Sequence, residues 1–174
     1  MSIIDSILNV FLGDKGKKDV KEVTPIVNSV IKFEEELSLI SNDQLRSITQ
    51  EFKDEIKQLK DPFLREIEDI NKIIEKSENI DENNDSYKQI KKIQNQYLDK
   101  LDDYLNSILP KAFAVVKETT KRFKNNKEIS VKATPFDENL SSIKSYVKLN
   151  GNSAVWSNSW DAAGKSITWD MIHY

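Results

Sequence analysis

The most constraining feature of this sequence is a helical repeat of apolar residues through its middle. A downstream stripe recurs at intervals of three and four residues, at Tyr87, Ile90, Ile93, Tyr97, Leu101, Tyr104 and Ile108. An upstream stripe has similar spacing, at Phe63, Ile67, Ile70 and Ile74. Such spacing places the apolar side chains on one face of a helix. The pattern predicts an antiparallel helical hairpin of residues 62–78 and 86–108, joined by the polar hinge NIDENND at 79–85.

Three further helices are expected before the hairpin. The first is a short amphipathic helix that ends near Gly13, with its apolar stripe at Ile3, Ile4, Ile7, Leu8 and Phe11 and a basic cluster behind it at Lys15, Lys17 and Lys18. The second is capped by Asp19, with an apolar side at Val23, Ile26, Val27, Val30, Ile31 and Leu37. Ser41 and Gln44 form a capping box for the third, whose buried stripe is Leu45, Ile48, Phe52, Ile56 and Leu59. Asp61 and Pro62 then restart the chain as cap and first helical residue.

The pattern changes after Asn126. Residues 128–170 contain EISVKATPF, YVKLNGNSAVW and KSITW, which have the alternation and β-branched content of short strands. Asn150-Gly151 and Ala162-Ala163-Gly164 are turn sequences between them. We therefore expect a small antiparallel sheet, which is marginal alone and needs something to pack on. The fold class is mainly α with a small antiparallel β element (α+β).

Composition excludes several classes of function. The 26 basic and 29 acidic residues are well mixed, so no face is basic enough to predict nucleic-acid binding. Without cysteine, and with one histidine, the chain has no pattern of metal ligands. No G-x-x-x-x-G-K-[ST] phosphate loop is present. The longest apolar run, AFAVV, is far shorter than the roughly 20 residues of a membrane-spanning helix.

Several segments in the same order resemble one family. ILPKAFAVVKETTKRF (108–123) is similar to the segment IPEAFAVVREASKR of the SecA family, the ATP-driven motors of bacterial preprotein translocation. LSLISNDQLRSITQEFKDEI (37–56) resembles the family's Leu-Ser-Asp-Glu-x-Leu cap followed by Thr-x-x-Phe, and VTPIVNSVIKFEEEL (23–37) resembles its opening. WDMIHY (169–174) is similar to the family's Met-x-His-Phe, which precedes Asp-Val-Gln.

The resemblance implies that the chain is the N-terminal part of a larger α/β helicase-like motor domain. Residues 1–60 are its N-terminal helices, and residues 109–126 form the helix that leads to the nucleotide-binding domain. The hairpin at 61–108 and the sheet at 127–174 look like insertions of the kind associated with SecA proteins of the Bacteroidetes, the latter followed by the start of the adenine-binding motif. The insertions are either structural elaborations that pack on the scaffold or a dedicated partner site.

The resemblance also implies a nucleotide site at the end of the chain. Met171 and Tyr174 match the motif positions that pack near adenine in the family, although both are equally the residue types of an ordinary core. His173 is expected to pack or hydrogen-bond and not to act as a catalyst. The chain is expected to stop just before the glutamine that recognises adenine. ATP and Mg²⁺ would therefore bind only the complete translocase, and this segment alone should lack ATPase activity.

The same family implies the partners. They are the SecYEG channel, preproteins, an anionic membrane surface and a second copy of the protein, at the cytoplasmic face of the inner membrane. The first helix with its lysine cluster suits such contacts, unless it docks within its own chain. Two other functions remain open: a stand-alone helical adaptor or scaffold, and a peripheral membrane protein anchored by residues 2–12, both without ATPase activity.

Overall fold

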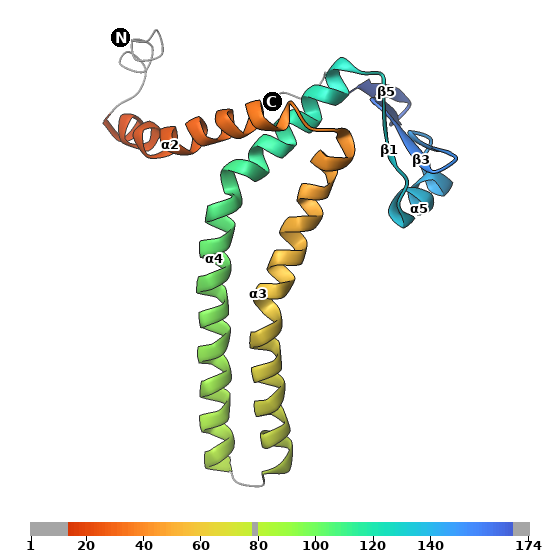
Figure 1. Cartoon of the computed structure of the whole chain (residues 1–174). Helices are drawn as coiled ribbons and strands as arrows, with labels where there is room; N and C mark the ends of the chain where they lie inside the picture. The colour runs from red at the N-terminus through yellow and green to blue at the C-terminus, as the bar shows by residue number, and fades with distance from the viewer. Residues whose placement is uncertain (1–13, 78–79, 169–174) are drawn as a thin grey trace. The chain divides into compact units, whose positions relative to one another are not determined.

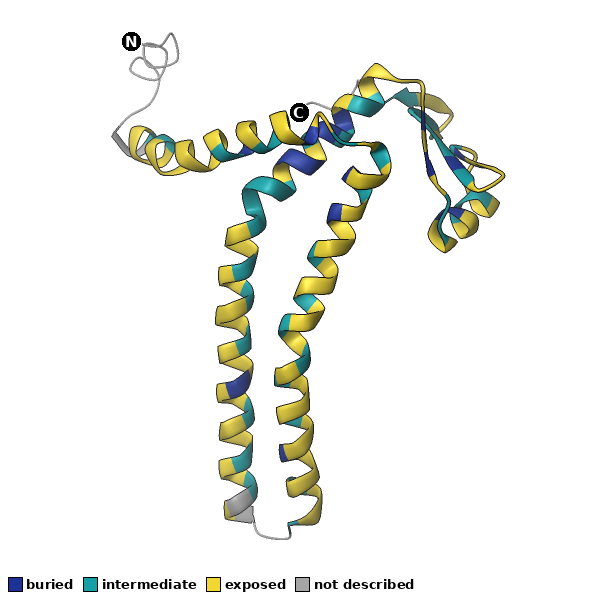
Figure 2. Ribbon diagram, viewed as in Figure 1, coloured by how far each residue is buried: buried dark blue, intermediate teal, exposed yellow. Residues whose placement is uncertain are grey.

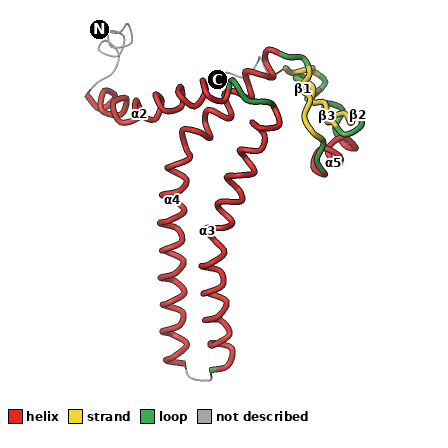
Figure 3. The backbone as a smooth tube through the Cα atoms, in the orientation of Figure 1, coloured by secondary structure: helices red, strands yellow, loops and turns green. Residues whose placement is uncertain are grey.

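The computed structural model describes residues 14–77 and 80–168, which form helices followed by short strands (Figure 1). The long helices are α2 (Asp14–Leu37), α3 (Asn42–Lys76) and α4 (Ile80–Asn125). The rest comprises β1 (Glu128–Lys132), α5 (Pro135–Ile143), β2 (Val147–Asn150), β3 (Ser153–Ser157), β4 (Ser159–Ala162) and β5 (Lys165–Thr168) (Figure 3). The predicted fold class, mainly α with a small antiparallel β element, is confirmed.

The chain divides into two compact units, and the division falls inside α3 and α4. The first unit comprises Met1–Leu45 and Pro110–Tyr174, and the second comprises Arg46–Leu109. The second unit covers both segments that were expected to form the hairpin, together with most of the helix expected before them.

Within the hairpin unit, α3 and α4 run antiparallel through one apolar seam. Tyr104 Oη donates a 2.8 Å hydrogen bond to Glu55 Oε2, while Tyr97 contacts Phe63 with ring centroids 5.7 Å apart. From the first contact to the second, the residue on α3 moves forward in the chain, from Glu55 to Phe63, and the residue on α4 moves back, from Tyr104 to Tyr97. The two helices are therefore antiparallel. Ile70 and Ile93 are buried at the seam, whereas most of the outer surface is exposed (Figure 2). Tyr87 was expected in this stripe, but it is 56% exposed, so its assignment was wrong.

The helices of the structure are longer than the sequence predicted. Helix α3 continues through Pro62, so the predicted restart at Asp61-Pro62 is wrong. Most of the polar hinge belongs to the first turns of α4, which begins at Ile80. Asp19 lies inside α2 and cannot be its N-cap. Each misplaced boundary rested on a local stop or start signal that the continuous helix overrides.

In the first unit, β1, β3 and β2 form an antiparallel sheet in that order, and β4 and β5 form a two-stranded ribbon. The predicted small antiparallel sheet is thus confirmed, although as two sheets. Ile129, Val131 and Ala154 are buried on one face of the larger sheet, where Phe123 of α4 packs against them. That contact supplies the support that so small a sheet needs.

Both predicted turns are present, with one shifted by a residue. Asn150 pairs with Ser153, so Gly151 is the first turn residue, and its φ of 57° is one that glycine adopts freely. Ala162 pairs with Lys165, so the second turn consists of Ala163 and Gly164, with φ of 50° and 75°. Two positive φ angles match a type I′ turn, which fits the right-handed twist of a hairpin.

Helix α5 was not predicted, because its first residues were assigned to a strand. Asp137 is fully buried and organises its start: Thr134 donates to Asp137 Oδ2 from its backbone nitrogen at 2.9 Å and from its hydroxyl at 2.8 Å. Trp156 Nε1 of β3 donates to Asp137 Oδ1 at 3.0 Å. The same carboxylate therefore caps the helix and fixes it to the sheet.

Candidate functional site

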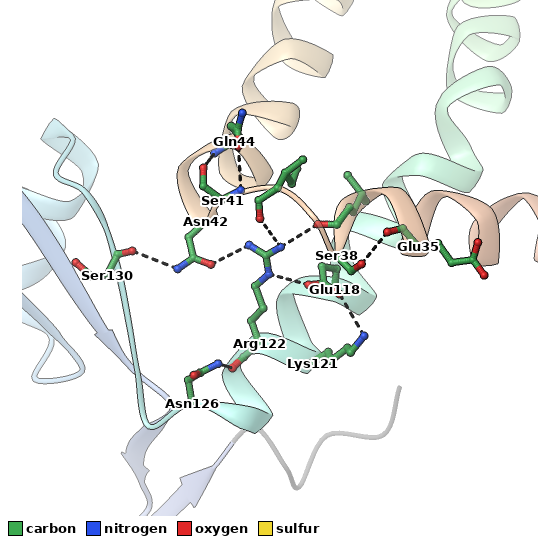
Figure 4. Close-up of polar contacts among 12 residues, drawn as sticks. Glu35, Ser38, Ser41, Asn42, Gln44, Glu118, Lys121, Arg122, Asn126 and Ser130 are labelled. Carbon is green, nitrogen blue, oxygen red and sulfur yellow. Dashed lines mark hydrogen bonds and ion pairs between the residues drawn. The ribbon is translucent and has the colours of Figure 1, made fainter.

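The most organised polar site in the described residues is centred on Arg122, near the end of α4 (Figure 4). Its Nη2 donates to the carbonyl oxygens of Leu37 and Ile40 at 2.9 and 2.8 Å. These carbonyls lie at the end of α2 and in the loop after it, where a helix leaves backbone acceptors without intrahelical partners. A cation at this position also complements the helix dipole. Arg122 thereby caps α2 from another helix.

The other guanidinium nitrogens bind two side chains. Nε donates to Glu118 Oε1 at 2.7 Å, one helical turn earlier on α4, and Nη1 donates to Asn42 Oδ1 at 2.8 Å, at the start of α3. The side chains of Arg122 and Glu118 are 14% and 5% exposed. Burial of this degree removes solvent screening, so the ion pair depends on its geometry and on the surrounding hydrogen bonds.

Only one carboxylate oxygen of Glu118, Oε1, accepts a hydrogen bond. Oε2 is buried without a hydrogen-bond partner among the described residues, and it forms an ion pair of 3.7 Å with Lys121 Nζ. On α2, Glu34 Oε2 forms an ion pair of 2.7 Å with Lys117 Nζ of α4. Two charged contacts therefore join α2 to the same stretch of α4.

The first turn of α3 connects this junction to the sheet. Asn42 Nδ2 donates to the Ser130 carbonyl at 3.4 Å, and the Lys132 backbone nitrogen donates to Asp43 Oδ1 at 2.7 Å. Strand β1 is an edge of its sheet, so these side chains satisfy backbone groups that would otherwise be open to another strand. The predicted capping box is confirmed, because Ser41 N donates to Gln44 Oε1 and Gln44 N donates to Ser41 Oγ.

The contacts of this arrangement join α2, α3, α4 and β1 to one another, so they position these elements. No group of three His, Cys, Asp or Glu residues within 14–77 and 80–168 is arranged to hold a metal. Nor is any helix in those ranges long and apolar enough to cross a membrane. The junction residues were missed at the sequence level, although Glu118 and Arg122 have the spacing of a helical ion pair within KETTKR.

Most of the predicted site residues lie outside the described part of the chain. This holds for the adenine-packing residues Met171 and Tyr174, and for the apolar stripe of Ile3, Ile4, Ile7, Leu8 and Phe11. From the sequence, the basic residues Lys15, Lys17 and Lys18 were expected to lie before the second helix. In the structure they belong to that helix, α2. Lys17 and Lys18 are exposed, and Lys18 forms a 3.9 Å ion pair with Glu22.

Comparison with known proteins identifies the family. Residues 8–142 match the sequence model of the SecA DEAD-like domain, which is well over half of the chain. The chain belongs to the SecA family. The matched range contains the Arg122 junction, the hairpin, β1 and most of α5.

Curated SecA relatives match over the whole chain. The protein translocase subunit SecA of Flavobacterium psychrophilum is 50% identical over all 174 residues, and that of Christiangramia forsetii is 46% identical over the same length. The SecA of Bacteroides fragilis is 34% identical over 98% of the chain. These sources agree with the predicted Bacteroidetes type. The chain spans only 15 to 16% of the length of these relatives. No solved structure matches the chain.

Proposed function

We propose that this chain forms the N-terminal part of the ATP-driven motor that moves preproteins through the SecYEG channel. The main support for this proposal is the 50% identity, over the full chain, to a protein translocase subunit SecA. A stand-alone adaptor has no comparable support, because its only argument is a charged helical surface of the kind common to many proteins.

In this proposal the Arg122 junction is a rigid support for the nucleotide site. Residues Met171 and Tyr174 pack against adenine, while the phosphate loop and the Mg²⁺ ligands belong to other parts of the complete translocase. Phosphoryl transfer requires a phosphate-binding loop and a metal-holding carboxylate, and the loop is absent from this sequence. The 174 residues alone should therefore not hydrolyse ATP.

The N-terminal segment is the proposed contact with the membrane or the channel. Ile3, Ile4, Ile7, Leu8 and Phe11 would enter the lipid interface, with Lys15, Lys17 and Lys18 near anionic headgroups. The protein would then act at the cytoplasmic face of the inner membrane, with preproteins and a second copy of itself as further partners.

The nucleotide role is tested in an extended polypeptide of the relatives' length that carries this sequence. Tyr174→Ala should raise the Kd for a fluorescent ADP analogue about 5- to 150-fold, because base–aromatic stacking is worth roughly 1–3 kcal/mol. Tyr87→Ala is the matched control, since this tyrosine is largely exposed on the hairpin. An unchanged Kd in a folded Tyr174→Ala variant would remove this residue from the adenine pocket.

A further inference from the structure

The outer face of the three-stranded sheet carries a polar cleft whose lining contains none of the residues of the Arg122 junction. Strand pairing places Glu128 opposite Ser157, and Lys148 opposite Val155. Because side chains alternate along a strand and Ile129 and Val131 are buried on the other face, Glu128 points to the outer face. Lys148 lies on this face as well, since its neighbour Val147 is buried.

The β4–β5 ribbon forms the second wall of the cleft. One residue separates β3 from β4, and the reversal is fixed by hydrogen bonds: Ser159 N donates to Ser157 Oγ at 3.2 Å, and Asn158 N donates to the Lys127 carbonyl at 2.8 Å. Trp160 and Asp161 of the ribbon thereby line the same space as Glu128 and Lys148. The cavity has a volume of about 290 Å³ and is open to solvent.

The chemistry of the lining favours a ligand rich in hydrogen-bond donors. Glu128, Lys148 and Asp161 make no side-chain ion pair with another residue of the described chain. Two carboxylates against one ammonium leave the cleft acidic, and four serine hydroxyls add acceptors. Trp160 and Tyr146 contribute aromatic rings to the lining, and such rings attract cations. The volume lies at the lower end of small-molecule sites, which suits one long side chain.

We propose that this cleft binds an arginine or lysine side chain of an unfolded polypeptide, with Glu128 and Asp161 as its charge partners. The choice of a polypeptide rests on the proposed function, because the relatives are protein translocase subunits. A guanidinium has five donors in a planar fork and forms paired hydrogen bonds with carboxylates, so arginine should bind more tightly than lysine. The serine hydroxyls then hydrogen-bond the neighbouring peptide backbone.

The test uses the 174-residue chain without nucleotide. A short fluorescein-labelled peptide of serine, glycine and alanine with spaced arginines is titrated, and its anisotropy gives the Kd. A matched peptide has citrulline in place of arginine, which keeps the shape and removes the charge. We expect the citrulline peptide to bind at least about 10-fold more weakly, and we expect affinity for the arginine peptide to fall with added salt.

Variants locate the binding. Glu128→Gln and Asp161→Asn should each weaken the arginine peptide about 5-fold or more, and the double variant should weaken it further. Glu66→Gln, an exposed carboxylate of the hairpin, removes the same charge elsewhere and should have no effect. Thermal melts of the variants confirm that they are folded, since both cleft carboxylates lie on exposed positions.

Two results would overturn the proposal. If Glu128→Gln and Asp161→Asn bind the arginine peptide as tightly as Glu66→Gln does, the cleft is not the site. If arginine amide competes as strongly as the peptide, the cleft holds a small cation and not a polypeptide. Neither result bears on ADP binding by the extended polypeptide, so failure here is distinct from failure of the proposed motor function.

Discussion

Arg122→Met should be among the most destabilising substitutions in the first unit. It removes all four hydrogen bonds of the guanidinium, two of which satisfy the carbonyls of Leu37 and Ile40. It also leaves the Glu118 carboxylate, which is 5% exposed, with only the longer 3.7 Å ion pair to Lys121. Breaking a buried ion pair from one side costs about 3–5 kcal/mol, because a buried charge remains uncompensated. We expect the free energy of unfolding of the first unit to fall by this amount.

The assay can follow this unit separately from the hairpin. The two described tryptophans, Trp156 and Trp160, lie in the first unit, and no tryptophan lies in the sequence of Arg46–Leu109. Tryptophan fluorescence during urea unfolding therefore reports on the unit that contains Arg122. Lys32→Met is the control, because it removes an exposed cation of α2 and should change stability by less than about 0.5 kcal/mol.

A double substitution separates the buried charge from the lost caps. Glu118→Gln combined with Arg122→Met removes the buried carboxylate, so it should recover part of the loss, while the carbonyls of Leu37 and Ile40 still lack their hydrogen bonds from Arg122. The double variant should thus be more stable than Arg122→Met alone and less stable than the parent. If Arg122→Met costs less than about 1 kcal/mol, or if the double variant is no better than the single one, the buried pair does not hold the junction together.

Three further predictions concern other parts of the chain. Ala163→Gly should raise the free energy of unfolding of the first unit by about 0.5–1 kcal/mol in urea titrations, because a φ of 50° strains an alanine more than a glycine; a decrease would refute the strained turn. Partial burial, and then the hydrogen bond to Glu55, raise the pKa of Tyr104 from 10.0 to about 12, so the stability it contributes is present below pH 10 and lost as the pH rises to 12. Tyr104→Phe should flatten that decline in urea titrations across this range, whereas parallel curves would show no coupling. Leu8→Glu in the extended polypeptide should weaken co-sedimentation with anionic vesicles, since it places a charge on the proposed apolar stripe; equal binding would favour a helix docked on its own chain.

Features with a local cause were predicted well from the sequence. The Ser41 and Gln44 capping box involves residues three apart, and both of its hydrogen bonds are present. The turns at Gly151 and Gly164 follow from residue types that tolerate positive φ. The hairpin followed from a repeat long enough to specify a helix.

The errors in helix boundaries arose where a local signal opposed a tertiary one. Proline normally ends or kinks a helix, because it lacks a donor and clashes with the preceding turn. Helix α3 nevertheless continues past Pro62, and the next residue, Phe63, contacts Tyr97 and lies 5.3 Å below Lys100 Nζ. The apolar stripe keeps its spacing across the proline, so continuing the helix retains the seam with α4. A strand was assigned at 128–136 by the same kind of local reasoning, although Thr134 and Asp137 have the spacing of a capping box.

The junction could not have been predicted from one sequence, because its bonds join segments that are far apart in the chain. Arg122 is 80 residues from Asn42 and 85 from Leu37, and two of its acceptors are backbone carbonyls that carry no residue-type signal. Its consequence extends to the sheet, since Asn42 also donates to Ser130 on the edge strand β1. An arginine that fixes Asn42 therefore also orients the amide that covers that edge. For this reason we expect loss of Arg122 to loosen the sheet as well as the end of α2, and to raise amide exchange at β1 together with the turn after α2.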